Sequence, residues 1–137
     1  MRDQASALFD ILAIARSFPD RADTMLVDTR LTDEPAASAR VFRVYTTVPP
    51  HYHATCDEYL FVVSGRALFT IGQLEPAEVG PGRLVFFKKS VVHSIVPIGD
   101  DPIVCLAVDT PRRDPRDIIF VNPADGTPDT FIQTLST

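Results

Sequence analysis

Short apolar runs bounded by proline, glycine or aspartate recur through most of the chain, and they constrain its fold more than any other feature. The clearest runs are residues 41–45, 59–63, 66–71, 84–87, 91–96 and 103–108. Runs of this length between turn residues are typical of strands rather than of long helices. Twelve prolines against six glycines add fixed turns and chain breaks. The pattern predicts an all-β fold, a barrel or sandwich of short strands.

The start of the chain has helical spacing instead. Within residues 3–18, apolar side chains recur at i, i+3, i+4 and i+7, at Leu8, Ile11, Leu12 and Ala15. Asp3 and Arg16 have the signs that a helix dipole favours at its two ends, and Pro19 ends the run. Asp10 interrupts the apolar stretch and argues against a signal peptide. We therefore expect a short N-terminal α-helix within residues 1–20, packed on the barrel or on a partner subunit.

The remaining residues are expected to belong to the same single domain, residues 1–137. Residues 21–110 are predicted to form the barrel, with a loop at residues 31–38. Residues 111–137 are predicted to form a C-terminal extension with one further strand at residues 118–121 and an apolar anchor at Phe131 and Ile132. The arginines between residues 112 and 116 could form a binding patch, but they are expected on a solvated face.

Composition excludes several classes of protein. A hydrophobic content of 45% with a net charge of −5 describes a globular protein rather than a disordered one. No stripe rich in lysine and arginine points to nucleic acid. No apolar run approaches the roughly 18 residues that a membrane span needs. Two cysteines are too few for a disulfide framework, and two free thiols without an export signal favour the cytoplasm.

All three histidines fall in strand-like runs. His51 and His53 are two residues apart, so on a strand their side chains point to one face. Glu58 follows after a stretch long enough for a turn and opens the next strand, and His93 lies in the run at residues 91–96. Imidazoles and a carboxylate are ligands for divalent first-row metals. His93 alone could equally be a core histidine with a backbone partner, but a shared metal site accounts for every histidine of the chain.

The spacing of these residues resembles the two motifs of the cupin superfamily, here His51-x-His53-x4-Glu58-x6-Gly65 and Gly82-x10-His93. The resemblance spans residues 40–110 and implies a double-stranded β-helix, or jelly-roll barrel. It also implies that the three histidines and Glu58 bind one metal inside the barrel. Tyr45 stands where the family has a glycine, and Lys88, Lys89 and Ser90 replace its Pro-x-Gly. These positions are not ligands, so the departures concern loops at the barrel mouth.

Three imidazoles and one carboxylate would leave a divalent metal such as Fe, Mn, Ni or Zn with one net positive charge. A centre of this kind suits a small anionic organic molecule. Arg43, Lys88 and Lys89 are candidates for pairing with that anion, and surface charges are the alternative. Tyr45 is a candidate acid or hydrogen-bond donor, and a tyrosine of the core or rim is the alternative.

The leading hypothesis is a metal-dependent cupin enzyme, and the family resemblance includes dioxygenases, decarboxylases, isomerases and lyases. The alternative is a cupin that binds or senses a small ligand or metal without catalysis. No nucleic-acid or membrane partner is expected. The apolar face of the N-terminal helix and the Phe131–Ile132 anchor offer more apolar surface than one small barrel covers, so we expect a homodimer.

Overall fold

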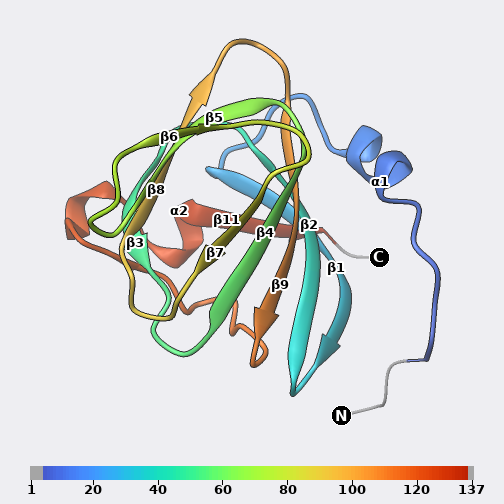
Figure 1. The fold of residues 1–137 in the computed structure, drawn as a ribbon. Coiled ribbons are helices and arrows are strands. Elements are labelled where there is room, and N and C mark those ends of the chain that lie inside the picture. The colour runs from blue at the N-terminus through green and yellow to red at the C-terminus, as the bar shows by residue number, and fades with distance from the viewer. Residues whose placement is uncertain (1–4, 136–137) are drawn as a thin grey trace.

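Two β-sheets face each other across an apolar interior in the computed structural model, which describes residues 5–135 (Figure 1). The described strands are β1 (Leu26–Glu34), β2 (Ala37–Val44), β3 (Val48–Tyr52), β4 (Asp57–Ser64), β5 (Arg66–Ile71), β6 (Ala77–Val79), β7 (Leu84–Phe87), β8 (His93–Ile98), β9 (Ile103–Thr110), β10 (Ile119–Phe120) and β11 (Ile132–Leu135). The described helices are α1 (Ile11–Ser17), the 3-10 helix η1 (Pro123–Asp125) and α2 (Pro128–Phe131). None of these helices is long and apolar enough to cross a membrane.

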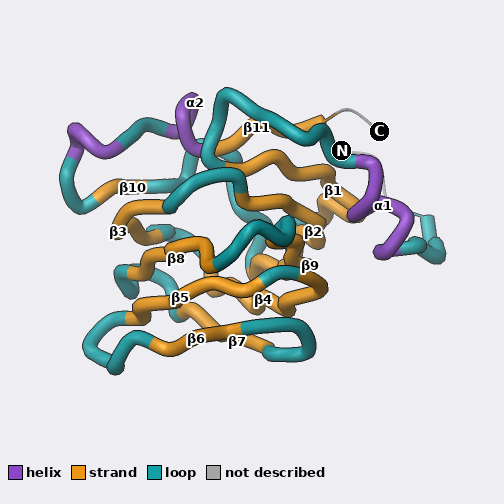
Figure 2. Tube along the Cα trace, turned by 90° about the horizontal axis from the view of Figure 1, so that it is seen from above, coloured by secondary structure: helices purple, strands orange, loops and turns teal. Residues whose placement is uncertain are grey.

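The strand order is that of a jelly-roll barrel. Sheet A has the order β11-β1-β2-β9-β4-β7, and sheet B has the order β10-β3-β8-β5-β6. After the β1–β2 hairpin the chain passes from one sheet to the other between successive strands, except between β5 and β6, and the two sheets lie face to face when seen from above (Figure 2). Among the described residues β1 and β11 pair in parallel, and the other recorded pairs are antiparallel. The predicted all-β jelly-roll fold is confirmed.

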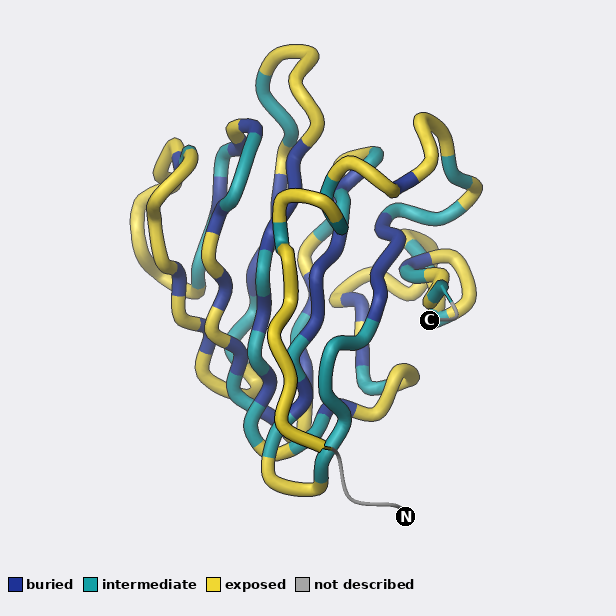
Figure 3. Tube along the Cα trace, turned by 90° about the vertical axis from the view of Figure 1, so that its right-hand side faces the viewer, coloured by how far each residue is buried: buried dark blue, intermediate teal, exposed yellow. Residues whose placement is uncertain are grey.

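Alternation along the strands separates the interior from the outer surface, as the buried and exposed positions in Figure 3 show. On β4 the residues Leu60 and Val62 are buried in the main core, whereas Tyr59 and Phe61 are exposed. A strand has a side-chain period of two, so each strand sends every second residue into the barrel. On β2 the outward residue Val41 is buried as well, because the second apolar cluster, which includes Ile11, Ile14 and Ala15 of α1, packs against it.

The N-terminal helix is shorter than predicted. α1 begins at Ile11, because the Asp10 side chain accepts a hydrogen bond from the Ala13 backbone at 3.0 Å and caps the helix. Leu8 is 101% exposed, and Leu12 is 59% exposed. The buried contacts are instead made by a second apolar cluster in which Phe18, Val27, Val41 and Val104 are joined by Ile11, Ile14 and Ala15. The predicted helix start at Asp3 lies outside the described residues.

The predicted loop at residues 31–38 is wrong. β1 continues to Glu34 and β2 begins at Ala37, so Pro35 and Ala36 form a tight hairpin turn. The ladder is maintained across a register shift between Arg30 and Thr32. The apolar pattern fades here because these residues are only partly buried, and backbone hydrogen bonds hold the strands.

The C-terminal segment is built into the barrel rather than appended to it. β10 pairs with β3 in sheet B, and β11 pairs with β1 in sheet A. Phe131 is 3% exposed and belongs to the main core. The predicted anchor at Phe131 is therefore confirmed as core of the same chain, and this ring is not free to bury itself against a partner subunit.

Candidate metal centre

The strands bring the three histidines together inside the barrel. His51 on β3 and His93 on β8 are direct partners in the ladder, and His53 follows β3 at once. Their exposed fractions are 2% for His51, 3% for His53 and 3% for His93. One ring nitrogen from each lies within 4.8 Å of the other two. Residues 42 positions apart in the sequence therefore offer nitrogen ligands to a single point.

Backbone carbonyls fix the tautomer of each ring. The Nδ1 atom lies 2.8 Å from the Pro49 carbonyl in His51 and 2.7 Å from the Asp117 carbonyl in His53. In His93 it lies 3.1 Å from the Val91 carbonyl. A carbonyl only accepts, so Nδ1 carries the hydrogen and Nε2 keeps its lone pair. Backbone partners of this kind orient histidine ligands in metal sites, so the donor set fits a metal.

The rings are also held neutral. Burial lowers the pKa of His51 to about 4, and its hydrogen bond to Pro49 opposes this shift only in part. Burial, together with the charge of Arg113 and the neighbouring rings, holds the pKa of His53 and His93 well below 6.5. Neutral imidazole is the form that coordinates metal. The site therefore presents three lone pairs at neutral pH.

Glu58 lies at the edge of this cluster. Its Oε1 atom is 3.6 Å from Nε2 of His53, and its Oε2 atom accepts a hydrogen bond from Arg40 at 2.8 Å. Burial raises the pKa of Glu58, and the guanidinium groups of Arg113 and Arg40 oppose that rise. Among the described residues the compact ligand group contains the three histidines alone. With Oε2 held by Arg40, Glu58 offers one oxygen, Oε1, toward the same point.

Arg40 is the centre of a buried ion network beneath the histidines. Its side chain is 0% exposed and lies 2.8 Å from Asp109, 2.8 Å from Glu58 and 3.5 Å from Asp28. Hydroxyl groups complete the network, since Ser38 donates to Asp109. Although burial alone would raise the pKa of Asp109, Arg40 and Arg113 hold it below its usual range. The same carboxylates raise the pKa of Arg40, against the effect of burial.

Arg113 also enters the site, which the sequence analysis did not foresee. It is 4% exposed, and its Nη1 atom lies 2.8 Å from Nε2 of His53 and 4.0 Å from Oε1 of Glu58. The expectation of a solvated face for Arg113 is wrong, because the residue folds into the barrel. It stands among four other charged residues between positions 112 and 117, and no local pattern distinguishes an inward arginine from a surface one.

Asp117 is a second residue that the sequence did not reveal. Its carbonyl accepts from His53, and its carboxylate accepts from the Ala54 backbone at 2.8 Å and from the Thr55 backbone at 3.0 Å. One aspartate thereby holds the loop between β3 and β4 and aligns a histidine ring. Its only sequence signal is an aspartate in a polar segment far from the motif.

The space between these groups is small and largely apolar. A cavity of about 10 Å³ remains, close to the volume for one water molecule. The Phe87 ring stacks on His93 at a centroid distance of 3.9 Å, and the rings of Phe120 and Phe131 lie 5.7 Å and 5.5 Å from His51. Phe120 and Phe131 belong to the C-terminal segment, so that segment encloses the site. Apolar walls of this kind strengthen electrostatic interactions inside.

Four further predicted site residues lie elsewhere. The Tyr45 hydroxyl donates to the Pro19 carbonyl at 2.6 Å, and the Arg43 guanidinium stacks 4.8 Å above the Tyr45 ring. Both residues occupy outward positions of β2 and its end, opposite in parity to Arg40. Lys88 is 64% exposed and its ammonium lies 3.9 Å from Asp57, whose carboxylate also accepts from the Lys89 backbone. None of these four residues lines the cavity at the histidines, so the structure favours the alternative for each: charges outside the pocket for Arg43, Lys88 and Lys89, and a tyrosine outside the pocket for Tyr45.

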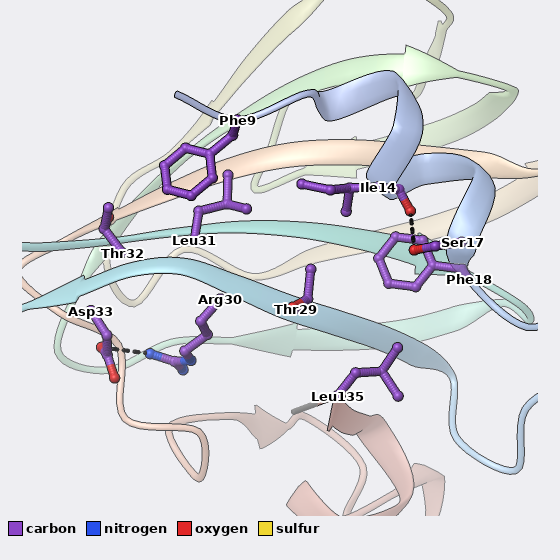
Figure 4. Close-up of a pocket in the computed structure, with 10 residues that line it drawn as sticks. All are labelled: Phe9, Ile14, Ser17, Phe18, Thr29, Arg30, Leu31, Thr32, Asp33 and Leu135. Carbon is purple, nitrogen blue, oxygen red and sulfur yellow. Dashed lines mark hydrogen bonds and ion pairs between the residues drawn. The ribbon is translucent and has the colours of Figure 1, made fainter. Parts of the chain in front are cut away.

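A larger hollow lies outside the barrel, between α1 and β1 (Figure 4). It measures about 670 Å³ and is lined by apolar and polar side chains in equal number, with Phe9 and Leu31 at one end and Phe18 and Leu135 at the other. Arg30, on its wall, pairs with Asp33 at 3.0 Å. No histidine lines this hollow. The groups able to bind a metal are inside the barrel, so size alone does not identify the chemical site.

Comparison with solved structures supports the same architecture. A conserved protein with a double-stranded β-helix domain from Klebsiella pneumoniae superposes with a TM-score of 0.65 at 16% identity, covering 80% of this chain and 93% of that one. A putative mannose-6-phosphate isomerase from Ralstonia eutropha gives a TM-score of 0.66 at 23% identity, and the match covers 77% of this chain and 98% of that one. KdgF from Halomonas gives a TM-score of 0.60 at 20% identity, and the match covers 69% of this chain and 88% of that one. At these identities the likeness concerns the fold alone.

The sequence comparisons identify the family. No curated protein sequence matches the chain at a significant level. The family model of the cupin domain matches residues 41–109, which include β3, β4 and β8 and every histidine of the chain. The barrel, the strand order and the motif residues agree with this match. The chain belongs to the cupin superfamily.

Proposed function

We propose that this cupin binds one divalent transition metal through His51, His53, His93 and Glu58 and acts as an enzyme on a small anionic organic molecule. The observation that carries the proposal is the orientation of the three imidazoles. Each donates Nδ1–H to a backbone carbonyl, so each directs an Nε2 lone pair toward the other two. Histidines that only filled the core would not have to direct their three Nε2 lone pairs toward one point.

The charges of the site support an anionic ligand with one negative charge. Arg40 and Arg113 contribute two positive charges, and Asp28, Glu58 and Asp109 contribute three negative ones. A divalent metal brings the sum to one positive charge. An uncompensated charge in an apolar interior is costly, so a monoanion is the ligand that neutralises the site.

The wall residues limit the kind of reaction. Among the described residues that line the cavity, the titratable side chains are the three histidines, Glu58 and Arg113. A bound metal supplies a Lewis acid at this position. Arg113 donates hydrogen bonds to negative charge, and the aromatic rings exclude water. The proposal therefore favours a lyase, isomerase or decarboxylase reaction that depends on charge stabilisation rather than on a separate acid or base.

The absence of another acid or base on the described lining also favours a second candidate, a cupin that binds or senses a monoanion without converting it. The two candidates make the same metal and anion contacts. They differ only in turnover, so one set of measurements separates them.

The test begins with elemental analysis of the purified protein and of the His51→Ala and His93→Ala variants after dialysis against a chelator. One equivalent of metal in the wild type and none in the variants is expected. The metal-loaded protein is then titrated with small monocarboxylates and their neutral amides. Preference for the carboxylates with a detectable product supports the enzyme, and binding without product supports the sensor. Equal metal retention in the variants would reject the site.

A further inference from the structure

We propose that Asp117 is a positioning residue for His53, and that the metal affinity of the site depends on Asp117 although it is not a ligand. This role rests on the proposed metal site and adds the residue that holds one of its ligands in place. Asp117 lies outside the segment matched by the cupin family, which ends at residue 109. It follows the ligands in sequence, in the stretch between β9 and β10.

Of the four proposed ligands, all in the described part of the chain, His53 alone lies outside a strand. The other three are on β3, β4 and β8, whereas His53 belongs to the ligand loop, residues 53–56, between the end of β3 at Tyr52 and the start of β4 at Asp57. In a strand, the pleat and the ladder set the direction of each side chain. The direction of the His53 side chain must therefore be set by contacts of the ligand loop.

The hydrogen bonds of the rings show the same difference. For His51 and His93, Nδ1 donates to the carbonyl two residues earlier in the chain, at 2.8 Å and 3.1 Å. The local backbone therefore orients these two rings. Nδ1 of His53 donates instead to the Asp117 carbonyl at 2.7 Å, across 64 positions of the sequence. The orientation of the third ring depends on a tertiary contact.

The Asp117 side chain holds the ligand loop itself. Its Oδ1 atom accepts a hydrogen bond from the Ala54 backbone at 2.8 Å. Its Oδ2 atom accepts from the Thr55 backbone at 3.0 Å and from the Thr55 hydroxyl at 2.7 Å. With the bond from the His53 ring, Asp117 accepts four hydrogen bonds from three consecutive residues. Because hydrogen bonds to a carboxylate are stronger than those to neutral acceptors, this contact restricts the loop.

Other contacts fix the segment that carries Asp117. The next residue, Ile118, is 5% exposed in the main core, and β10 pairs with β3. Removal of the carboxylate should therefore free the ligand loop without undocking the C-terminal segment. The Ser90 N–H still donates to the His53 carbonyl at 2.7 Å, so the loop is loosened rather than lost. His53 then loses its fixed orientation, whereas the other two rings keep theirs.

Two other roles for the carboxylate make different predictions. If Asp117 only stabilised the fold, its removal would lower the free energy of unfolding and leave the Zn²⁺ affinity of the folded protein unchanged. If Asp117 acted only through its negative charge, its removal would weaken Zn²⁺ binding whether or not His53 is present. The positioning role predicts a loss of affinity that requires His53. A double-mutant cycle of the two residues separates these roles.

The experiment introduces Asp117→Ala into wild type and into His53→Ala. Zn²⁺ affinity is measured at pH 7.5 by competition with a chromophoric chelator, and folding is followed by circular dichroism in EDTA. In wild type the substitution should weaken Zn²⁺ binding about tenfold to a hundredfold, as expected when a partner that orients a metal ligand is lost. In His53→Ala it should leave the affinity unchanged. Asp114→Ala is the matched control and should bind as wild type does, because Asp114 is exposed in the same segment and its carboxylate accepts from the Arg116 backbone instead.

The apo protein gives a second readout that needs no metal. NMR of isotope-labelled histidine in EDTA detects the ring N–H groups, and the His53 signal is assigned by its absence in His53→Ala. In Asp117→Ala this signal should broaden or vanish through exchange with water, while the signals of the other two rings remain. A His53 signal as sharp as in wild type would overturn the inference. If His53→Ala binds Zn²⁺ too weakly to complete the cycle, this signal decides in its place.

Unchanged Zn²⁺ affinity in folded Asp117→Ala, or an equal loss with and without His53, would overturn the inference while leaving the metal site intact. If Asp117→Ala fails to fold, Asp117→Asn replaces it in the same cycle, since asparagine keeps one acceptor oxygen but turns an NH2 group toward a donor of the loop. Its affinity should fall only where His53 is present, and any other result overturns the inference. Absence of Zn²⁺ binding in wild type would reject the proposed function itself.

Discussion

Replacing Arg40 with methionine should be among the most destabilising changes in the barrel that keep side-chain size. Arg40 is 0% exposed and pairs with Asp28, Glu58 and Asp109, which are 1%, 4% and 0% exposed. Arg113 remains nearby, at 3.9 Å from Asp109 and 4.0 Å from Glu58, and offsets the loss only in part. Removing one partner of a buried ion network costs about 3–5 kcal/mol. We expect a loss of that size in the free energy of unfolding at pH 7.5.

The decrease in unfolding free energy caused by Arg40→Met should be smaller at lower pH. Without Arg40, the pKa values of the buried carboxylates rise, so the folded variant takes up protons that the unfolded chain does not yet bind. Acidification then stabilises the variant relative to wild type, by up to about 1.4 kcal/mol per pH unit for each carboxylate that titrates. The histidines titrate in both proteins, so their contribution cancels in the difference. The gap between the two proteins should narrow from pH 7.5 to pH 5.5.

Urea denaturation in EDTA, followed by circular dichroism, measures this gap at the two pH values. Arg116→Met is the control for loss of one arginine, because Arg116 is 65% exposed, and its stability should stay near that of wild type. An Arg40→Met protein within about 1 kcal/mol of wild type at pH 7.5 would show that the network is not needed for folding. A gap that is equal at both pH values would show that the carboxylates are already protonated.

Three other predictions concern the histidines, the enclosing ring and assembly. In EDTA the free energy of unfolding should fall as the pH drops from about 6.5 toward 4, by about 1.4 kcal/mol per pH unit for each histidine. The reason is that burial lowers the pKa of His51 to about 4, whereas a histidine of the unfolded chain titrates near 6.5. A free energy of unfolding, measured with urea, that does not change over this pH range would contradict the prediction. Phe131→Ala should lower the free energy of unfolding by about 3–5 kcal/mol in the same urea assay, because the ring is 3% exposed in the core. A decrease below about 1 kcal/mol would mean that the C-terminal segment is loosely packed. The expected homodimer should be seen by sedimentation at concentrations on the order of tens of micromolar. Leu12→Glu should shift the equilibrium toward monomer, because Leu12 is 59% exposed on α1. A monomeric wild type at these concentrations would reject the dimer.

The sequence was sufficient to predict the barrel and to identify the residues that converge in it. Strands are local patterns with a period of two, and the motif spacing of His51, His53 and Glu58 fits a strand, a turn and a second strand. His93 could be included because it was the only other histidine of the chain. The structure brings the three rings together, and Glu58 reaches them from the opposite sheet with one oxygen.

Features that depend on tertiary contacts could not be predicted in the same way. Tyr45 and Arg43 were misplaced because their orientation depends on which face of β2 enters the barrel. Apolar residues lie on both faces of that strand, Phe42 and Val44 in the main core and Val41 against α1, so the sequence pattern does not identify the inner face. Arg113 was missed for the opposite reason, since a charged residue in a polar segment gives no sign of burial. Its burial depends on the negative charge of Glu58 and Asp109, both distant in sequence.

Residues inside the family match and residues that follow it have different positions at the candidate site. The three histidines and Glu58 lie within residues 41–109, the range of the family match. The residues around those ligands follow it: the Asp117 carbonyl accepts from the His53 ring, Arg113 lies against the same ring, and Phe131 lies against His51. The candidate ligands are therefore part of the common barrel, whereas residues that enclose them belong to the C-terminal segment. Substrate differences among barrels of this kind should follow such segments, because the ligand strands leave little freedom to vary.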